Sequence, residues 1–135
     1  MKLTYDILFR DAKKFKMPEE LLIYAWLAVN RGGLALGQML STMYDKPLGV
    51  IDPHTQEFIL PKDFGLFHTP VLLIDDVAKT GSTIKICKDL LQGIDVKTLF
   101  YIYDPSNKAE VPDYYILKTS VWLELPWEPG DEGRS

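Results

Sequence analysis

Along the chain, the apolar residues alternate between short continuous runs and longer segments with helical spacing. Between Tyr5 and Phe15 they recur at intervals of three and four residues, which is typical of an amphipathic helix with Thr4 as its N-cap. Further helices are expected over 34–44 and 81–92, the latter with Gly93 as C-cap, and strands over the second half of 21–29 and over 46–51, 71–74, 96–102 and 113–117. Because strands and helices alternate, the sequence predicts an α/β fold with a mostly parallel sheet.

The segment 71–84, with the sequence VLLIDDVAKTGSTI, joins a buried strand to the start of a helix through a polar turn. Asp75 and Asp76 follow the strand directly, and ligands of open α/β sheets bind outside the carboxyl ends of the strands. The turn and the first helical residues offer backbone N–H groups and hydroxyls, a combination that favours phosphate. The predicted phosphate-binding residues are Lys79, Thr80, Gly81, Ser82 and Thr83. An ordinary, well-capped strand–turn–helix is the alternative to a ligand site.

A second polar turn follows the apolar run at 21–29 and contains Asn30, Arg31, Gly32 and Gly33. Paired glycines let a backbone approach a ligand closely, and Arg31 adds a fixed positive charge. A tight turn with a solvated arginine is the alternative. Because both turns would lie at the same edge of the sheet, we expect one site there. Its two carboxylates and its phosphate-binding turn suit a phosphorylated sugar with a bound divalent cation.

Composition limits the classes of protein that the chain can represent. With 135 residues, of which 47% are hydrophobic and 25% charged, residues 1–135 are expected to form one globular domain. The formal net charge of −4 argues against nucleic acid or an anionic membrane as a partner. No apolar run approaches the ~18 residues that span a bilayer. Cys87 is the only cysteine, so we expect no disulfide and a cytoplasmic protein.

Taken together, the motifs resemble those of the type I phosphoribosyltransferases, which use phosphoribosyl diphosphate (PRPP). LIDDVAKTGST is similar to the PRPP motif of that family, and NRGG to its pyrophosphate loop. TYDILFRDAKKF is similar to the opening helix of the xanthine-guanine phosphoribosyltransferases, and VWLELPWE to their purine-binding end. The resemblance implies a Rossmann-like, twisted, mostly parallel sheet flanked by helices, with a minimal base-binding hood. It also implies transfer of a 5-phosphoribosyl group to a purine base in nucleotide salvage, with Mg²⁺ as the metal.

The resemblance assigns roles to the two polar turns. Asp75 and Asp76 would hold the ribose hydroxyls and magnesium. Arg31 and the amides of the two glycines after it would bind pyrophosphate, and in that family the peptide bond at this position is often cis. The turn at 79–83 would bind the 5′-phosphate. No covalent nucleophile is needed, because the protein would act by positioning and by charge stabilisation.

The base is expected near the C-terminal end of the chain. By resemblance, Trp122 would stack on the purine, Leu123 would read the base edge through its main chain, and Glu124 would hold a second magnesium. Asp104 stands before a proline, where the family has a lysine that recognises the 6-oxo group. An ionised acid accepts hydrogen bonds and donates none, so Asp104 suits a base with an exocyclic amine. The sequence therefore leaves the identity of the base open.

Two further departures keep a second function in view. Lys79 replaces the acid that the family carries three residues after the paired acids, and the segment 52–68 is short for the family's mobile lid. Both features fit a catalytically weak regulatory protein that binds PRPP or a nucleotide. The complete pyrophosphate loop and the base-stacking tail favour the enzyme. A nucleoside phosphate hydrolase would need a base that activates water, and Lys79 argues against one. Relatives form dimers or tetramers, so a homo-oligomer is expected.

Overall fold

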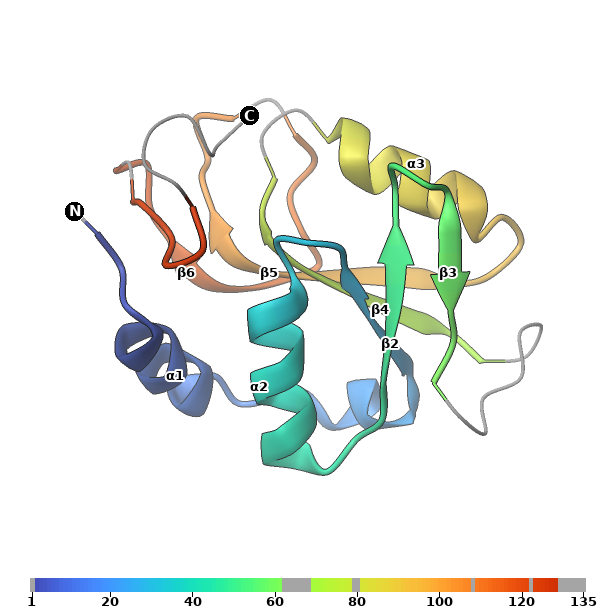
Figure 1. Cartoon of the computed structure of the whole chain (residues 1–135), viewed down its shortest axis with the longest axis horizontal. Helices are drawn as coiled ribbons and strands as arrows, with labels where there is room; N and C mark the ends of the chain where they lie inside the picture. The colour runs from blue at the N-terminus through green and yellow to red at the C-terminus, as the bar shows by residue number, and fades with distance from the viewer. Residues whose placement is uncertain (1, 62–68, 79–80, 108, 122, 129–135) are drawn as a thin grey trace.

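The computed structural model describes residues 2–61, 69–78, 81–107, 109–121 and 123–128, and the strands of these residues form one six-stranded sheet (Figure 1). The strand order is β3-β2-β1-β4-β5-β6, and all neighbouring strands are parallel except β2 and β3. The strands are β1 (Ala25–Val29), β2 (Leu48–Asp52), β3 (Glu57–Ile59), β4 (Val71–Val77), β5 (Val96–Tyr103) and β6 (Tyr114–Lys118). The helices are α1 (Tyr5–Lys14), α2 (Leu34–Tyr44) and α3 (Ser82–Leu90), with a short 3₁₀ helix at Glu19–Ile23. The predicted α/β architecture is confirmed.

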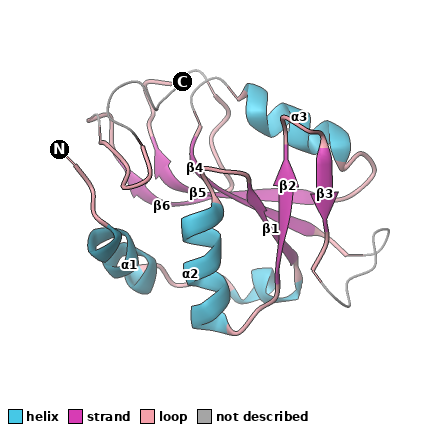
Figure 2. Cartoon of the chain, in the orientation of Figure 1, coloured by secondary structure: helices cyan, strands magenta, loops and turns pink. Residues whose placement is uncertain are grey.

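Alternate residues of the central strands face opposite layers of helices (Figure 2). Trp26, Leu72 and Ile74 pack in a buried cluster with residues of α1 and α2. Leu27 and Leu73, each one residue along, pack in a second cluster with Cys87 of α3. Because both faces of β1 and β4 are covered, these strands read as continuous apolar runs rather than as an alternating pattern.

Some predicted element boundaries were wrong. β4 does not end at Ile74 but continues through both acids to Val77, which pairs with Ile102 of β5. Strand pairing is made by backbone groups, so the apolar run could not reveal this extension. Helix α3 ends at Leu90 with Leu91 as its C-cap, and the predicted cap, Gly93, lies two residues later with φ 86°.

Helix α1 starts at the predicted cap but buries fewer apolar residues than its pattern suggests. The Thr4 hydroxyl accepts a hydrogen bond from the Ile7 backbone N–H at 3.2 Å, as expected of an N-cap. Leu8 and Ala12 are fully buried, whereas Tyr5 and Phe9 are 53% and 42% exposed. The helix therefore covers the sheet along a narrower stripe than the sequence indicates.

Strands β2 and β3 form an antiparallel hairpin at the position expected for the lid, whose later residues 62–68 lie outside the described part of the chain. The Asp52 carboxylate organises the turn, because its Oδ1 accepts from the backbone N–H groups of His54 (2.8 Å) and Thr55 (3.2 Å).

Among the helices described, none is long and apolar enough to cross a membrane.

Candidate active site at the carboxyl edge of the sheet

The glycine-containing turn after β1 lies directly against the end of β4. A Cβ atom added at Gly33 would stand 2.0 Å from the carbonyl oxygen of Ile74. A Cβ atom at Gly32 would stand 2.5 Å from the Asp76 carboxylate. At Gly33 the facing atom is a backbone carbonyl oxygen, so only glycine fits there, and at Gly32 a larger residue would displace the Asp76 carboxylate. The two turns predicted to share a site therefore do meet at one edge of the sheet.

The two acids of β4 have different surroundings. Asp75 is 6% exposed, shares the strand face of Leu73 toward α3, and its Oδ1 accepts the backbone N–H of Asp76 at 2.8 Å. Burial raises the pKa of Asp75 well above its usual range, and the charge of Asp76 adds to the rise. Asp76 is half-buried, and its Oδ1 accepts the backbone N–H of Val77 at 2.6 Å. Asp76 is thus the acid that is open to a ligand.

Asn30 anchors the predicted pyrophosphate loop, residues 30–33, to the end of β2. Its backbone N–H donates to the Ile51 carbonyl and its side-chain amide to Asp52 Oδ2, both at 2.8 Å. The hydrogen bond from the Asn30 side-chain amide is the largest cause of a lowered pKa at Asp52. The hydrogen bonds from the backbone N–H groups of Thr55 and His54 lower this pKa further. The Asn30–Arg31 peptide bond is cis, and the Arg31 side chain is exposed. The arginine is therefore available to a ligand at the sheet edge.

The predicted phosphate turn leads into α3 through a left-handed glycine. Gly81 has φ 82° and its carbonyl accepts the Lys85 backbone N–H at 2.9 Å, while Ser82 and Thr83 are exposed in the first helical turn. Of the residues predicted to bind phosphate, Lys79 and Thr80 lie outside the described residues. Just before them, the Ala78 carbonyl accepts a hydrogen bond from the side-chain amide of Asn107 at 2.8 Å. Asn107 is not among the predicted residues, because a contact across 29 residues leaves no local pattern in the sequence.

Asp104, predicted to contact the base, also shapes its own loop. Its Oδ1 accepts from the backbone N–H of Ser106 at 2.9 Å and from the Ser106 hydroxyl at 2.6 Å, and its carbonyl accepts the Asn107 N–H at 3.1 Å. These bonds make a turn of the kind that aspartate favours. The base contact of Asp104 stays a prediction.

The C-terminal tail, described at residues 119–121 and 123–128, folds back beside the start of the chain. The Leu3 backbone N–H donates to the Glu124 carbonyl at 2.7 Å, and Leu123 and Leu125 are buried in the core beside α1. Trp122, the predicted stacking residue, lies outside the described residues. Trp127, for which no partner was predicted, donates from its indole N–H to Asp76 Oδ2 at 3.3 Å. The tail therefore reaches the acid pair.

The donor set at the sheet edge fits magnesium that is shared with a substrate. Within the described ranges, no three His, Cys, Asp or Glu side chains lie together as a metal site, so Glu124 does not complete a three-carboxylate cluster with Asp75 and Asp76. Magnesium is usually held by one or two protein carboxylates together with substrate phosphates and water. Two adjacent acids at the edge, one of them open to a ligand, meet that requirement.

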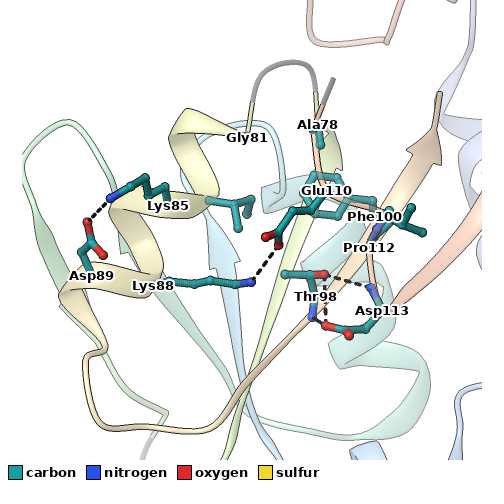
Figure 3. Close-up of a pocket in the computed structure, with 13 residues that line it drawn as sticks. Ala78, Gly81, Lys85, Lys88, Asp89, Thr98, Phe100, Glu110, Pro112 and Asp113 are labelled. Carbon is teal, nitrogen blue, oxygen red and sulfur yellow. Dashed lines mark hydrogen bonds and ion pairs between the residues drawn. The ribbon is translucent and has the colours of Figure 1, made fainter. Parts of the chain in front are cut away.

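A separate groove of about 430 Å³ lies on the α3 face of β5, between α3 and the loop at 109–113 (Figure 3). Its rim carries the ion pairs Lys85–Asp89 (3.2 Å) and Lys88–Glu110 (3.6 Å). Neither acid of the pair nor any residue of the pyrophosphate loop lines it, but Ala78 and Gly81 do. The groove is thus next to the predicted phosphate turn, at Ala78 and Gly81.

No family model matches the chain, but solved structures do. A purine phosphoribosyltransferase from Pyrococcus horikoshii is 29% identical over 95% of this chain and 93% of its own, with a TM-score of 0.71. The xanthine-guanine-hypoxanthine phosphoribosyltransferase of Helicobacter pylori is 19% identical over 93% and 91%, with a TM-score of 0.65. Orotate phosphoribosyltransferase from Aeropyrum pernix is 22% identical over 84% and 71%, with a TM-score of 0.61. The Helicobacter pylori and Aeropyrum pernix structures show the fold alone, whereas the Pyrococcus horikoshii structure also supports an enzyme of this class.

Proposed function

We propose that this chain, which has the type I phosphoribosyltransferase fold, transfers the 5-phosphoribosyl group of PRPP to a ring nitrogen of a purine base and releases pyrophosphate. The observation that carries the proposal is the contact between the pyrophosphate loop and the acid pair, with Gly32 and Gly33 pressed against Asp76 and the Ile74 carbonyl. The 29% identity to a purine phosphoribosyltransferase over nearly the whole chain supports the same reaction. The product would be a purine nucleotide, as in salvage.

The described residues divide the work of the reaction. The bond from ribose C1 to the pyrophosphate oxygen breaks as the bond to the base nitrogen forms, and the base nitrogen gives up its proton to water. Arg31 and the amides of the two glycines would hold the leaving pyrophosphate, where negative charge develops. Asp76, the more open acid, would accept hydrogen bonds from the ribose hydroxyls beside Asp75. Bound magnesium would add charge neutralisation on the pyrophosphate oxygens.

The remaining predicted residues complete the site. The turn formed by Lys79, Thr80, Gly81, Ser82 and Thr83 would hold the 5′-phosphate, with Lys79 neutralising charge. Trp122 would stack on the base, which contributes roughly 1–3 kcal/mol per base in stacked complexes. Leu123 would read the base edge through its main chain, Asp104 would accept from an exocyclic amine, and Glu124 would hold a second magnesium.

Pyrophosphate release tests the proposal. Purified protein would be incubated with PRPP, Mg²⁺ and one base at a time, covering guanine, xanthine, hypoxanthine, adenine and pyrimidines. We expect release with a purine and a loss on the order of 100-fold in Asp76→Asn. Asp89→Asn is the matched control, because this exposed acid on α3 pairs with Lys85 away from the acid pair, and its rate should equal that of the wild type.

Binding without turnover would point to the second candidate, a regulatory protein that binds PRPP or a nucleotide. The observation that favours it is Asp104, whose carboxylate is engaged within its own loop by Ser106. If PRPP binds and no base releases pyrophosphate, this second function replaces the first.

We further propose that residues 1–135 act as one domain, that copies of the chain assemble into a dimer or tetramer, and that the protein works in the cytoplasm without nucleic acid or membrane. The net charge of −4 and the single buried cysteine support the last two points.

A further inference from the structure

Trp127 bridges two parts of the molecule that are far apart in the sequence. Its indole N–H donates to Oδ2 of Asp76, 51 residues earlier, at 3.3 Å. Its ring lies 6.3 Å from that of Tyr5, centroid to centroid, at the start of α1. Trp127 itself is only half-buried. Its contacts therefore include a polar one, to an acid of the proposed site, as well as apolar packing.

The bond from Trp127 bears on how the Asp76 carboxylate is turned. The terminal torsion of aspartate has a broad energy minimum, so the hydrogen-bond donors around it decide its orientation. One oxygen, Oδ1, accepts from the Val77 backbone N–H, and the other accepts from Trp127. The space beside this carboxylate is kept open by Gly32, since a Cβ atom there would stand 2.5 Å from it. The indole thus fixes the one acid that faces the pyrophosphate loop.

The same contact also holds the tail on which the base-binding residues are predicted. Residues 123–128 are fixed at one end by the Leu3 N–H···O=C Glu124 bond and at the other by the Trp127 contact with Asp76. Leu123 lies directly before the first of these two contacts and is 6% exposed. The indole N–H of Trp127 therefore holds the predicted base-binding tail in a fixed position relative to the acid pair.

We propose that Trp127 is a positioning residue, whose indole N–H orients the Asp76 carboxylate for the PRPP ribose and fixes the tail relative to it. The inference rests on the proposed function, because it takes PRPP as the ligand of Asp76. Trp127 touches no reacting atom and acts through Asp76. Removing the indole N–H while keeping an aromatic ring is then expected to reduce the free energy of PRPP binding. The reduction in the free energy of unfolding should be smaller.

The test compares two variants that divide the contacts of Trp127. Trp127→Phe keeps an aromatic ring beside Tyr5 but removes the donor, whereas Tyr5→Leu removes the ring contact and keeps the donor. The affinity for PRPP would be measured by titration calorimetry with Mg²⁺ present, and the melting temperature by circular dichroism. We expect Trp127→Phe to weaken PRPP binding by about fivefold to tenfold, since a hydrogen bond to a carboxylate is lost. Tyr5→Leu should bind PRPP as the wild type does.

A double-mutant cycle separates positioning from packing. In an Asp76→Ala background, Trp127→Phe should have no further effect on PRPP affinity, because the side chain that accepts the indole N–H is gone. Equal PRPP affinity in Trp127→Phe and the wild type, or equal losses in both backgrounds, would overturn the inference while leaving the proposed function standing. A wild-type protein that does not bind PRPP overturns both. Binding of PRPP without turnover, combined with the expected cycle, keeps the inference and rejects the transferase reaction.

Discussion

Gly32 and Gly33 sit at two contacts of different kinds. The atom facing Gly33 is a backbone carbonyl of β4, which cannot move without disturbing the central strand. The atoms facing Gly32 belong to the end of the Asp76 side chain, which can rotate away. An added methyl group therefore strains the fold at Gly33 and displaces the Asp76 carboxylate at Gly32.

Alanine substitutions should separate these two effects. We expect Gly33→Ala to lose about 1–3 kcal/mol of unfolding free energy together with PRPP binding, because a buried overlap must be relieved. Gly32→Ala should keep most of its stability but bind PRPP about tenfold more weakly or worse, since the carboxylate is misplaced. Urea unfolding and calorimetry measure the two quantities. Gly93→Ala is the control: its φ of 86° costs stability, yet it meets no atom within 4 Å and should bind PRPP normally.

At the scale of single residues, the predicted site includes the acids and the paired glycines. It does not include Trp127, whose indole N–H donates to Asp76. Asp75, Asp76 and the paired glycines stand in short motifs whose spacing implies a strand followed by a turn. The different burial of the two acids follows from strand alternation beyond Ile74, which the apolar run did not extend to. The partner of Trp127 is set by how the tail folds back over α1, and no local pattern encodes that contact.

Three contacts tie the loop between β5 and β6 to its surroundings. The Asn107 amide holds the Ala78 carbonyl, Glu110 pairs with Lys88, and Asp113 exchanges hydrogen bonds with Thr98. The groove of Figure 3 lies between this loop and α3, and Glu110 and Asp113 of the loop line it. Of these three contacts, the Asn107 bond is the one that reaches Ala78, directly before the predicted phosphate turn.

Asn107→Ala should therefore affect PRPP more than the base. We expect about 1 kcal/mol lower unfolding free energy and a KM for PRPP raised about threefold to fivefold, because one hydrogen bond is lost and the turn after Ala78 is less restrained. The KM for the base should change little. Glu110→Gln, in the same loop, removes an ion pair whose acid side chain is 88% exposed and should be neutral in both respects. An unchanged KM for PRPP in Asn107→Ala would mean that the loop does not position the turn.

Element types were more predictable from the sequence than element ends. Helices α1 and α2 follow from the helical spacing of their apolar residues, and the central strands from continuous apolar runs, because both faces of these strands are buried. The three-residue strand β3, with the burial pattern exposed–intermediate–exposed, carries no such signal and exists through its pairing with β2. For the same reason the length of β4 was underestimated, since its last residues are held by β5 through backbone bonds.

On each face of the sheet, a titratable side chain is buried in the core. On the α1 side, the Tyr101 hydroxyl donates to Asp11 Oδ2 at 2.8 Å and links β5 to α1. On the α3 side, Cys87 is fully buried beneath the helix. Burial raises the pKa of the Cys87 thiol from 9.0 to about 12, with smaller contributions from the charges of Asp75 and Asp52. Burial, then the bond to Asp11, raises the pKa of Tyr101 above its ordinary value of 10.0.

These shifts predict a loss of stability at alkaline pH. A raised pKa in the folded state stabilises the fold below the unfolded pKa, and the gain disappears as the pH rises toward the folded value, because the unfolded chain then binds fewer protons. The unfolding free energy should therefore fall from about pH 9 for Cys87 and from pH 10 for Tyr101, each by roughly 1.4 kcal/mol per pH unit. Urea unfolding between pH 8 and pH 11 measures this slope. Cys87→Ala should flatten it from pH 9 and Tyr101→Phe from pH 10, even though each variant is less stable than the wild type at pH 8. Slopes that match the wild type in both variants would mean that neither buried group drives the alkaline loss.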